Sequence, residues 1–369
     1  MFKQFFKKHL KKYIIFATIF VVLFITAIFS SSINNFVIRH LEKDKQIVYK
    51  GDKLLVHILS VGEADACVIQ FPNGENCIID CGTIYTASSV VDYINDNILN
   101  HSKTKVINYL FFTHADDDHT GGIEAIVNNF DVKNIIRPRQ YSEAEGIYDR
   151  YGTIVDSDIY TRTINAIYKE KELGANLIKA EDGLVFYIGK AKLEIFYPLA
   201  KYKESNDYSY FIKLSYNNKS MLFTGDALFE SEEELLKIHK DDIKCDILKV
   251  SHHGGDNASS YKFLQAVNAE YALISVGANR LGHPAEVVLD KLNDLNCKVY
   301  RTDVHGSFVI ALDKDIKFYL GKYIFSPIKI SYKIFVILVI MVLLLCVIID
   351  LFKLIILTVN KKKLTKLLK

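Results

Sequence analysis

The sequence predicts an α/β protein built as a four-layer αββα sandwich, with a transmembrane helix on either side of it. Two observations predict the sandwich. Strand-like segments followed by helix-like segments occur twice in the same order, and in each half polar side chains follow the ends of the strands. A third observation, two apolar runs near the termini, predicts the flanking helices. At 369 residues the chain is long enough to bury a sizeable core.

Both apolar runs have the composition of membrane-spanning helices. The first, Tyr13–Ser30, carries no charge, and the second, at 334–358, is interrupted only by Asp350 and Lys353, whose side chains can reach the interface. A cleaved signal peptide is the alternative for the first run. Its apolar core spans only ~7–15 residues and ends at a small-x-small site, and no clear site of that kind follows here. We therefore expect two uncleaved spans.

Lysine clusters at both ends predict the orientation of the chain. Basic tails at 1–12 and 359–369 flank the spans, and such flanks stay cytoplasmic. A linker at 31–53 and a domain at 54–320 are then expected outside the cell membrane. Of 46 basic residues, 11 lie in the tails and the second span, and of 43 acidic residues only Asp350 does, which leaves 35 basic against 42 acidic residues. A net acidic domain disfavours tight binding of nucleic acid.

The first half of the domain contains eight segments whose apolar residues alternate or run continuously, as strands require. Three segments between them have apolar residues at helical spacing. The expected strands are 54–59, 66–71, 76–80, 106–113, 135–137, 177–180, 184–188 and 192–197, and the expected helices are 88–99, 122–130 and 157–171.

The second half repeats this order. A hairpin comes first, and helices then alternate with strands until two last strands close the domain. The expected strands are 210–215, 220–224, 245–250, 271–276, 298–301, 307–312 and 316–320, and the expected helices are 230–240, 261–267 and 285–295.

The densest group of metal-binding side chains follows a buried strand of the first half. His114, Asp116, Asp118 and His119 lie within six residues of one loop. The carboxyl ends of strands are where α/β proteins place their chemistry. A solvated acidic loop is the alternative, but two histidines among the carboxylates favour a site for two metal ions.

Three other strand ends supply further ligand types. Asp80 and Asp226 each end a strand, and His252 and His253 end another. A carboxylate between two cations suits Asp226, because a bridging anion relieves the repulsion of two metals ~3.5–4 Å apart. Asp80 suits the role of a carboxylate that holds a ligand histidine by its far ring nitrogen. Singly, each aspartate could instead cap a turn.

The order of these motifs resembles the metallo-β-lactamase superfamily and, within it, the extracellular hydrolase domain of the ComEC family of DNA-uptake proteins. The resemblance covers about Leu54 to Leu320. The segments that carry it are 61–66, the turn at Asp80, 113–122, 224–226, 249–254, 275–284 and 300–306.

This resemblance implies two metal sites that share one carboxylate. The first is expected to contain His114, Asp116 and Asp226. The second is expected to contain Asp118, His119, Asp226 and one histidine of the pair that follows the strand at 245–250, with His252 preferred as the ligand and His253 as a nearby acid or phosphate contact.

The sequence also departs from the superfamily pattern. Asp116 stands where the superfamily usually has a second histidine, and no histidine occurs between Thr120 and Gly225. Oxygen-rich ligands make Mn as suitable as Zn for two divalent ions. Glu63 and Ala64 replace the usual Gln-Gly, which puts an acidic group at the entrance.

Three further residues are candidates by position. His283 precedes Pro284 and could either donate a proton to a leaving oxygen or cap a turn. Asp65 and Asp303 lie either near the metals or only brace their loops.

We therefore expect a membrane-anchored hydrolase in which two divalent ions activate a water as hydroxide, with Asp118, His253 and His283 as catalytic residues. The substrate would be a phosphodiester, either DNA, as for a nuclease of DNA uptake, or an envelope polymer such as teichoic acid or its phosphocholine esters. Two spans cannot form the ComEC channel. A catalytically impaired metal-binding or assembly module is the alternative outside the enzyme class.

Overall fold

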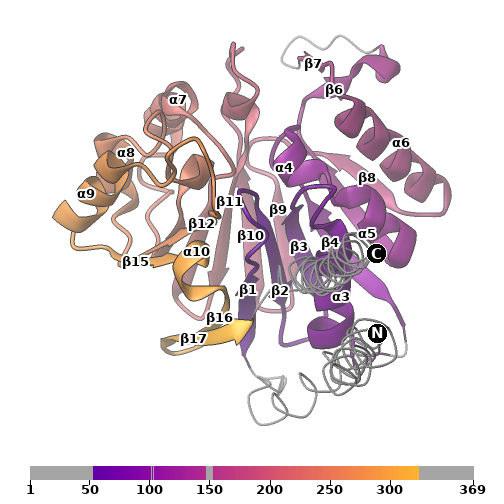
Figure 1. The fold of residues 1–369 in the computed structure, drawn as a ribbon, viewed down its shortest axis with the longest axis horizontal. Helices are drawn as coiled ribbons and strands as arrows, with labels where there is room; N and C mark the ends of the chain where they lie inside the picture. Colours follow the sequence, from indigo (N-terminus) through magenta and orange to yellow (C-terminus); the bar gives the residue numbers. More distant parts are fainter. Residues whose placement is uncertain (1–52, 101, 103, 147–152, 324–369) are drawn as a thin grey trace, which may run out of the picture. The chain divides into compact units, whose positions relative to one another are not determined.

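A computed structural model describes residues 53–100, 102, 104–146 and 153–323 (Figure 1). The predicted spans at 13–30 and 334–358, both basic tails and nearly all of the linker lie outside these residues. Within the described part of the chain, no helix combines the length and the apolar composition that crossing a membrane requires.

The first sheet has eight strands in the order β17-β16-β1-β2-β3-β4-β5-β8. Neighbours from β17 to β3 are antiparallel, and neighbours from β3 to β8 are parallel. The strands are β1 (Leu54–Ile58), β2 (Ala66–Gln70), β3 (Asn76–Cys81), β4 (Val106–Phe111), β5 (Asp131–Arg137), β8 (Asn176–Lys179), β16 (Ser307–Leu312) and β17 (Ile316–Tyr323).

The second sheet has seven strands in the order β15-β14-β13-β12-β11-β10-β9. Neighbours from β9 to β12 are antiparallel, and neighbours from β12 to β15 are parallel. The strands are β9 (Val185–Ile188), β10 (Ala191–Phe196), β11 (Phe211–Tyr216), β12 (Lys219–Phe223), β13 (Ile247–Lys249), β14 (Tyr271–Ile274) and β15 (Lys298–Arg301).

The two sheets pack face to face, and helices cover their outer faces. Alternate residues of a strand point to opposite sides, so Ile69 of β2 lies in the cluster between the sheets while Val68 lies in the cluster under the helices. The helices of the first sheet are α3 (Ala87–Tyr93), α5 (Ile123–Asn129) and α6 (Asp158–Glu172), and those of the second are α7 (Phe229–His239), α8 (Tyr261–Val267) and α9 (Glu286–Asp294). The predicted αββα sandwich is confirmed.

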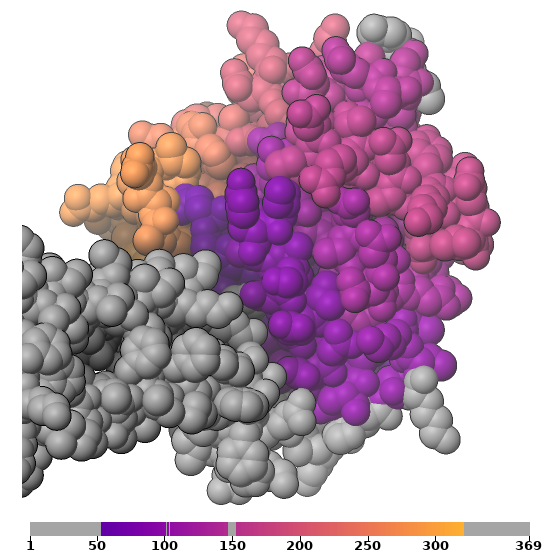
Figure 2. All heavy atoms as spheres, turned by 45° about the vertical axis from the view of Figure 1, so that its right-hand side comes forward, coloured from indigo at the N-terminus to yellow at the C-terminus, as the bar shows by residue number. Residues whose placement is uncertain are grey.

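Figure 2 shows the molecule turned by 45° from the view of Figure 1. The indigo to magenta residues of the first half of the domain form a continuous surface on the side that comes forward. Each fully buried aliphatic side chain beneath it stabilises the fold by roughly 1.5–3 kcal/mol. Burial on both faces of each sheet therefore explains why most of its strands consist of nearly continuous apolar residues.

The structure differs from the prediction mainly at short elements. The helix expected at 88–99 is α3 followed by a π-helix at Ile94–Ile98, where the amides of Asn95 and Asn97 donate to carbonyls one turn earlier. Segments of two to four residues are too short to show a period. Those not predicted are α4 (Asp117–Thr120), α10 (Thr302–His305), β6 (Tyr141–Ser142), β7 (Ile154–Val155) and the 3-10 helices Glu143–Glu145, Asn206–Tyr208 and Ser251–Gly254.

Candidate metal centre

The metal loop leaves the carboxyl end of β4 and is anchored by Asp80, the next-to-last residue of β3. Asp80 has a φ of 56°, and its carboxylate accepts hydrogen bonds from the backbone nitrogen of Thr113 (2.8 Å), the hydroxyl of Thr113 (2.9 Å) and Nδ1 of His119 (2.9 Å). Gly122 closes the loop, because a Cβ there would lie 2.1 Å from the carbonyl oxygen of Cys81. The loop is thus fixed at both ends.

In each of three buried histidines, Nδ1 has a partner within the protein, and Nε2 is the nitrogen that can bind a metal ion. Nδ1 of His119 is bound to Asp80, Nδ1 of His253 donates to the carbonyl of Ser275 (2.8 Å), and Nδ1 of His114 contacts the hydroxyl of Thr113 (3.1 Å). A protein partner on one ring nitrogen fixes the tautomer and leaves the other free for a metal. The other atom is Nε2 in all three rings. It has no hydrogen-bond partner in His114 and His119, and in His253 it contacts Asp118 Oδ2 at 3.0 Å.

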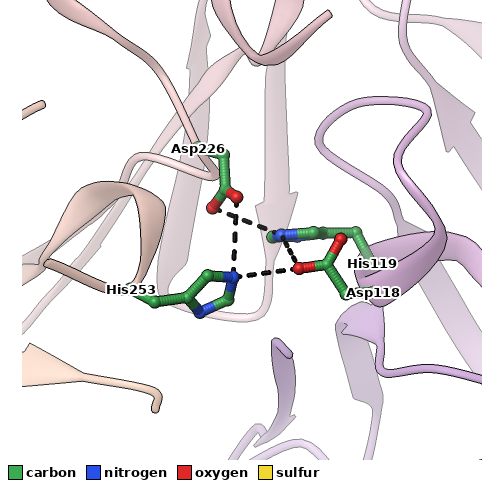
Figure 3. A group of neighbouring side chains, drawn as sticks. All are labelled: Asp118, His119, Asp226 and His253. Carbon is green, nitrogen blue, oxygen red and sulfur yellow. Dashed lines mark hydrogen bonds and ion pairs between the residues drawn. The ribbon is translucent and has the colours of Figure 1, made fainter. Parts of the chain in front are cut away.

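Four side chains converge between the two sheets (Figure 3). Ligand atoms of Asp118, His119, Asp226 and His253 all lie within 4.8 Å of one another. Nε2 of His253 lies 3.0 Å from Asp118 Oδ2 and 3.5 Å from Asp226 Oδ2, and Nε2 of His119 lies 3.2 Å from Asp226 Oδ1. The two oxygens of Asp226 therefore lie near two different histidines of the same group.

The residues present fit a divalent ion. Nε2 of His114, Nε2 of His119 and Oδ1 of Asp226 are buried and have no hydrogen-bond partner. Buried polar atoms without partners are costly, and native proteins rarely leave them so. A cation between these atoms would satisfy all three, and imidazole with carboxylate is a ligand set that suits Zn or Mn.

His114 and Asp116 lie next to this group and outline a second position. Their closest atoms, Nε2 and Oδ2, are 3.7 Å apart, and the rings of His114 and His119 are 4.3 Å apart between centroids. Asp116 is held by Ser205, whose hydroxyl donates to Oδ1 at 2.6 Å and accepts from Gln140 Nε2 at 2.8 Å. Sequence analysis missed Ser205 and Gln140, because nothing in the pattern linked them to Asp116.

Comparison with known proteins places this fold and site in a family. Residues 60–278 match the model of the metallo-beta-lactamase superfamily. The chain belongs to this superfamily. Its curated relatives include "ComE operon protein 3" of Bacillus subtilis, 25% identical over 68% of this chain and 32% of that protein. "Competence protein ComA" of Neisseria gonorrhoeae is 24% identical over 70% of this chain and 32% of that protein.

A third relative, "Recombination protein 2" of Haemophilus influenzae, is 24% identical over 70% of this chain and 29% of that protein. The chain therefore spans about a third of the length of the curated relatives that it matches. The predicted resemblance to the superfamily and to ComEC-like proteins is confirmed.

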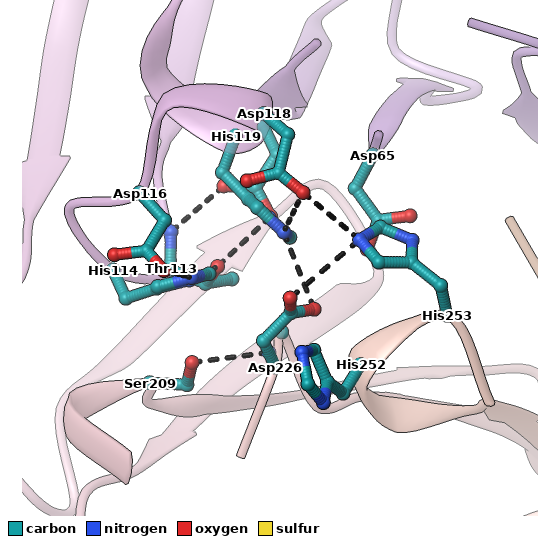
Figure 4. A network of polar contacts seen from close by, with 12 residues as sticks. Asp65, Thr113, His114, Asp116, Asp118, His119, Ser209, Asp226, His252 and His253 are labelled. Carbon is teal, nitrogen blue, oxygen red and sulfur yellow. Dashed lines mark hydrogen bonds and ion pairs between the residues drawn. The ribbon is translucent and has the colours of Figure 1, made fainter. Parts of the chain in front are cut away.

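The sequence favours His252 of the histidine pair as the ligand, whereas the structure places His253 in the group that could hold a metal ion. Both have positive φ, 51° and 52°, and this sharp turn directs His253 inward. Nδ1 of His252 contacts Asn257 Oδ1 at 2.8 Å, and Figure 4 shows its ring among the polar side chains around the cluster.

Asp303 and Asp65 have different surroundings. Both oxygens of Asp303 bind Arg301, at 3.0 and 2.6 Å, and among the described residues it makes no contact with the metal cluster. Asp303 therefore braces its own loop. Asp65 lies beside the cluster, with a carboxylate oxygen within 4.8 Å of ligand atoms of Asp80 and His119.

Asp65 forms a buried ion pair with Lys249 of β13, at 2.8 Å. The pair joins the first sheet to the second beneath the cluster, beside an enclosed cavity of about 10 Å³. The backbone nitrogen of Asp65 also donates to the carbonyl of Asp118 at 3.2 Å. The charges of Asp65 and Lys249 compensate each other, because a buried charge without a partner would destabilise the fold.

The pKa shifts show that the cluster carries excess negative charge. Burial acts to raise the pKa of Asp118, but the charge of His119 and the hydrogen bond from His253 lower it to about 2. Burial acts to lower the pKa of His253, but the charge of Asp226 and the hydrogen bond to Asp118 raise it to about 9. A metal ion that binds Nε2 of His253 therefore competes with a proton.

Counting charges indicates how many cations the centre can hold. Five carboxylates and one ammonium lie in or around the cluster, which leaves four negative charges when the histidines are neutral. Two divalent ions neutralise this charge. The groups are Asp65, Asp80, Asp116, Asp118, Asp226 and Lys249.

Proposed function

We propose that this chain is a membrane-anchored hydrolase of phosphodiester bonds that faces the outside of the cell and uses two divalent ions, Zn or Mn. The observation that carries the proposal is the group of Asp118, His119, Asp226 and His253, whose ligand atoms all lie within 4.8 Å of one another, with His114 and Asp116 next to it. Together with the buried Nε2 atoms that lack partners, this arrangement supports a centre for two ions.

The residues divide into two ligand sets. Asp118, His119, Asp226 and His253 would hold one ion, and His114, Asp116 and Asp226 the other. Two such ions, when bound, lower the pKa of a water to near neutrality and neutralise charge on the phosphoryl oxygens. Asp80 holds the ring of His119 in place for this purpose.

Around the ions, other side chains act on the substrate. Asp118 is half-buried, with 30% of its side chain exposed, and orients the attacking water. The rings of His252 and His283 lie 5.2 Å apart between centroids. His252 contacts a phosphoryl oxygen, and His283 gives a proton to the leaving oxygen.

Names of the relatives and the charge of the domain suggest different substrates. Two relatives are named for competence and recombination, which supports DNA. The net acidic domain repels a polyanion, which favours a small diester or a zwitterionic phosphocholine ester of the envelope as the second candidate. A metal-binding module without turnover would belong to a different class.

A panel of substrates tests the proposal. The full-length protein in detergent, loaded with Mn or with Zn, is incubated with DNA, bis(p-nitrophenyl) phosphate, teichoic acid and a phosphocholine ester. We expect turnover of the small diester with at least one metal, and none after chelation. Absence of turnover of every substrate, in protein that retains both metal equivalents, would leave only the binding module.

The orientation needs a separate measurement. Because lysines flank both predicted spans, protease added to intact cells should cut between residues 31 and 330 and spare both tails. An epitope tag at each end, detected on blots before and after lysis, gives the result. Cleavage of the domain only after lysis would show the opposite orientation.

A further inference from the structure

Glu63 and His283 meet across the two halves of the fold. Glu63 lies between β1 and β2, and His283 lies between β14 and α9, 220 residues later. Nδ1 of His283 donates to Glu63 Oε1 at 2.9 Å, and only 10% and 19% of the histidine and glutamate side chains are exposed. The contact is therefore well shielded from solvent.

Backbone packing fixes both residues. Gly277 lies against the segment before Glu63 so closely that a Cβ on it would be 2.6 Å from the Cα of Gly62. The side chain of Asn279 organises the other loop: its Oδ1 accepts from the backbone nitrogen of His283 at 3.1 Å, and its Nδ2 donates to the carbonyl of His283 at 2.7 Å. Glu63 and His283 thus sit on two interlocked loops.

The ring of His283 lies next to the metal centre. Its centroid is 6.5 Å from that of His253, and the two rings are nearly parallel at 22°. Gly255 leaves room on this side, because a Cβ there would be 3.0 Å from Nε2 of His283. Nε2 therefore lies on the side of His252, away from Glu63.

Glu63 is the acidic partner of His283. In the described part of the chain it is the only acidic side chain within ion-pair distance of His283. Its other oxygen, Oε2, is buried and has no hydrogen-bond partner. The remaining groups that face the ring are His252 and His253 from the neighbouring segment, and neither carries negative charge.

We propose that Glu63 is the positioning residue for His283, holding the ring so that Nε2 delivers a proton to the leaving oxygen of the diester. The inference rests on the proposed phosphodiesterase function. Water loses one proton to solvent and attacks phosphorus, the bond from phosphorus to the leaving oxygen breaks with its electron pair on that oxygen, and the oxygen takes the Nε2 proton. Solvent then returns a proton to Nε2. His283 keeps its Nδ1 proton on Glu63 throughout. Burial and the charge of His252 lower the pKa of His283, and the charge of Glu63 and its hydrogen bond act against this change.

Comparing two diesters whose leaving groups differ in basicity distinguishes a role of Glu63 in proton donation from a purely structural role. p-Nitrophenolate leaves without a proton, whereas the alkoxide of a nucleoside needs one. The loss of a proton donor therefore slows hydrolysis of a thymidine dinucleotide and spares bis(p-nitrophenyl) phosphate. A distorted metal centre would slow both.

The experiment compares kcat for these two diesters in full-length, Mn-loaded protein. The variants are His283→Gln, Glu63→Ala, Glu63→Gln and the double variant Glu63→Ala/His283→Gln, and the control is Glu233→Gln, a glutamate of α7 whose side chain is 73% exposed. Metal content and thermal unfolding are measured for each. If Glu63→Ala does not fold, Glu63→Gln and His283→Gln still provide the comparison.

For His283→Gln and Glu63→Ala we expect kcat on the dinucleotide to fall about 100-fold, the lower range for a general acid, with two Mn equivalents retained and little change on the nitrophenyl diester. Glu63→Gln should lie between, because its amide oxygen still accepts from Nδ1. The double variant should be no slower than His283→Gln, since both act on one step.

Three results would count against the inference, and each has a different consequence. If the Glu63 variants hydrolyse the dinucleotide as fast as Glu233→Gln does, the proposed role of Glu63 is wrong, but the proposed hydrolase function still stands. A parallel loss on both diesters would show that Glu63 only braces its loop. No turnover by metal-loaded wild type would remove the proposed function, and the inference with it.

Discussion

Asp226→Ala will remove most of the bound Mn or Zn from the full-length protein. Asp226 is the one carboxylate that both ligand sets share, and its side chain is almost fully buried. Its loss leaves His119 and His253 without the charge that holds a cation between them. Metal analysis of the purified protein should give close to two equivalents for wild type and well under one for the variant.

A matched control separates this effect from a general loss of charge. Asp256 follows the same histidine pair and is exposed, so Asp256→Ala removes one carboxylate near the site without touching the cluster. It should retain both equivalents. Full metal content in Asp226→Ala would show that the assigned coordination is wrong, and loss of a single equivalent would indicate one ion bound elsewhere.

Much of the fold could be predicted from the sequence, because its strands and helices show clear periods. Segments such as Tyr261–Val267 and Ser307–Leu312 have the predicted bounds. Four-residue helices such as α4 could not be found this way, since one turn shows no period. The order of motifs along the chain, rather than any single motif, indicated the superfamily.

The candidate site was only partly predictable for a different reason. His119, Asp118 and Asp226 follow strand ends, and the carboxyl ends of parallel strands meet. Which of His252 and His253 points into the cluster could not be predicted, because the direction of each ring depends on two consecutive residues with positive φ, which is uncommon outside glycine.

Contacts between distant segments were also invisible in the sequence. Lys249 and Glu63 were not named as site residues, because each finds its partner, Asp65 or His283, only after the two sheets pack together. A lysine within an apolar strand is the one signal that was available. Such a residue is rarely buried without a partner, and Lys249 lies three positions before the histidine pair.

Asp118→Ala distinguishes an enzyme from a binding module and should have the largest effect on turnover. Asp118 contacts His253 at 3.0 Å and is the most exposed member of the four-residue group, so it is the ligand that meets the attacking water. Losing several kcal/mol of transition-state stabilisation corresponds to about a 1,000-fold or greater decrease in kcat, at roughly 1.4 kcal/mol for each factor of ten. A module that only binds metal would show no turnover to lose.

The neighbouring Asp117 provides the control for this prediction. It belongs to the same one-turn helix, α4, but is exposed and accepts a hydrogen bond from Ser157. Asp117→Ala should therefore keep wild-type kcat on bis(p-nitrophenyl) phosphate. Similar activity of the two variants would mean that the loop does not hold the catalytic centre. A 1,000-fold gap between adjacent aspartates in folded protein would be hard to explain except through the ion that Asp118 helps to bind.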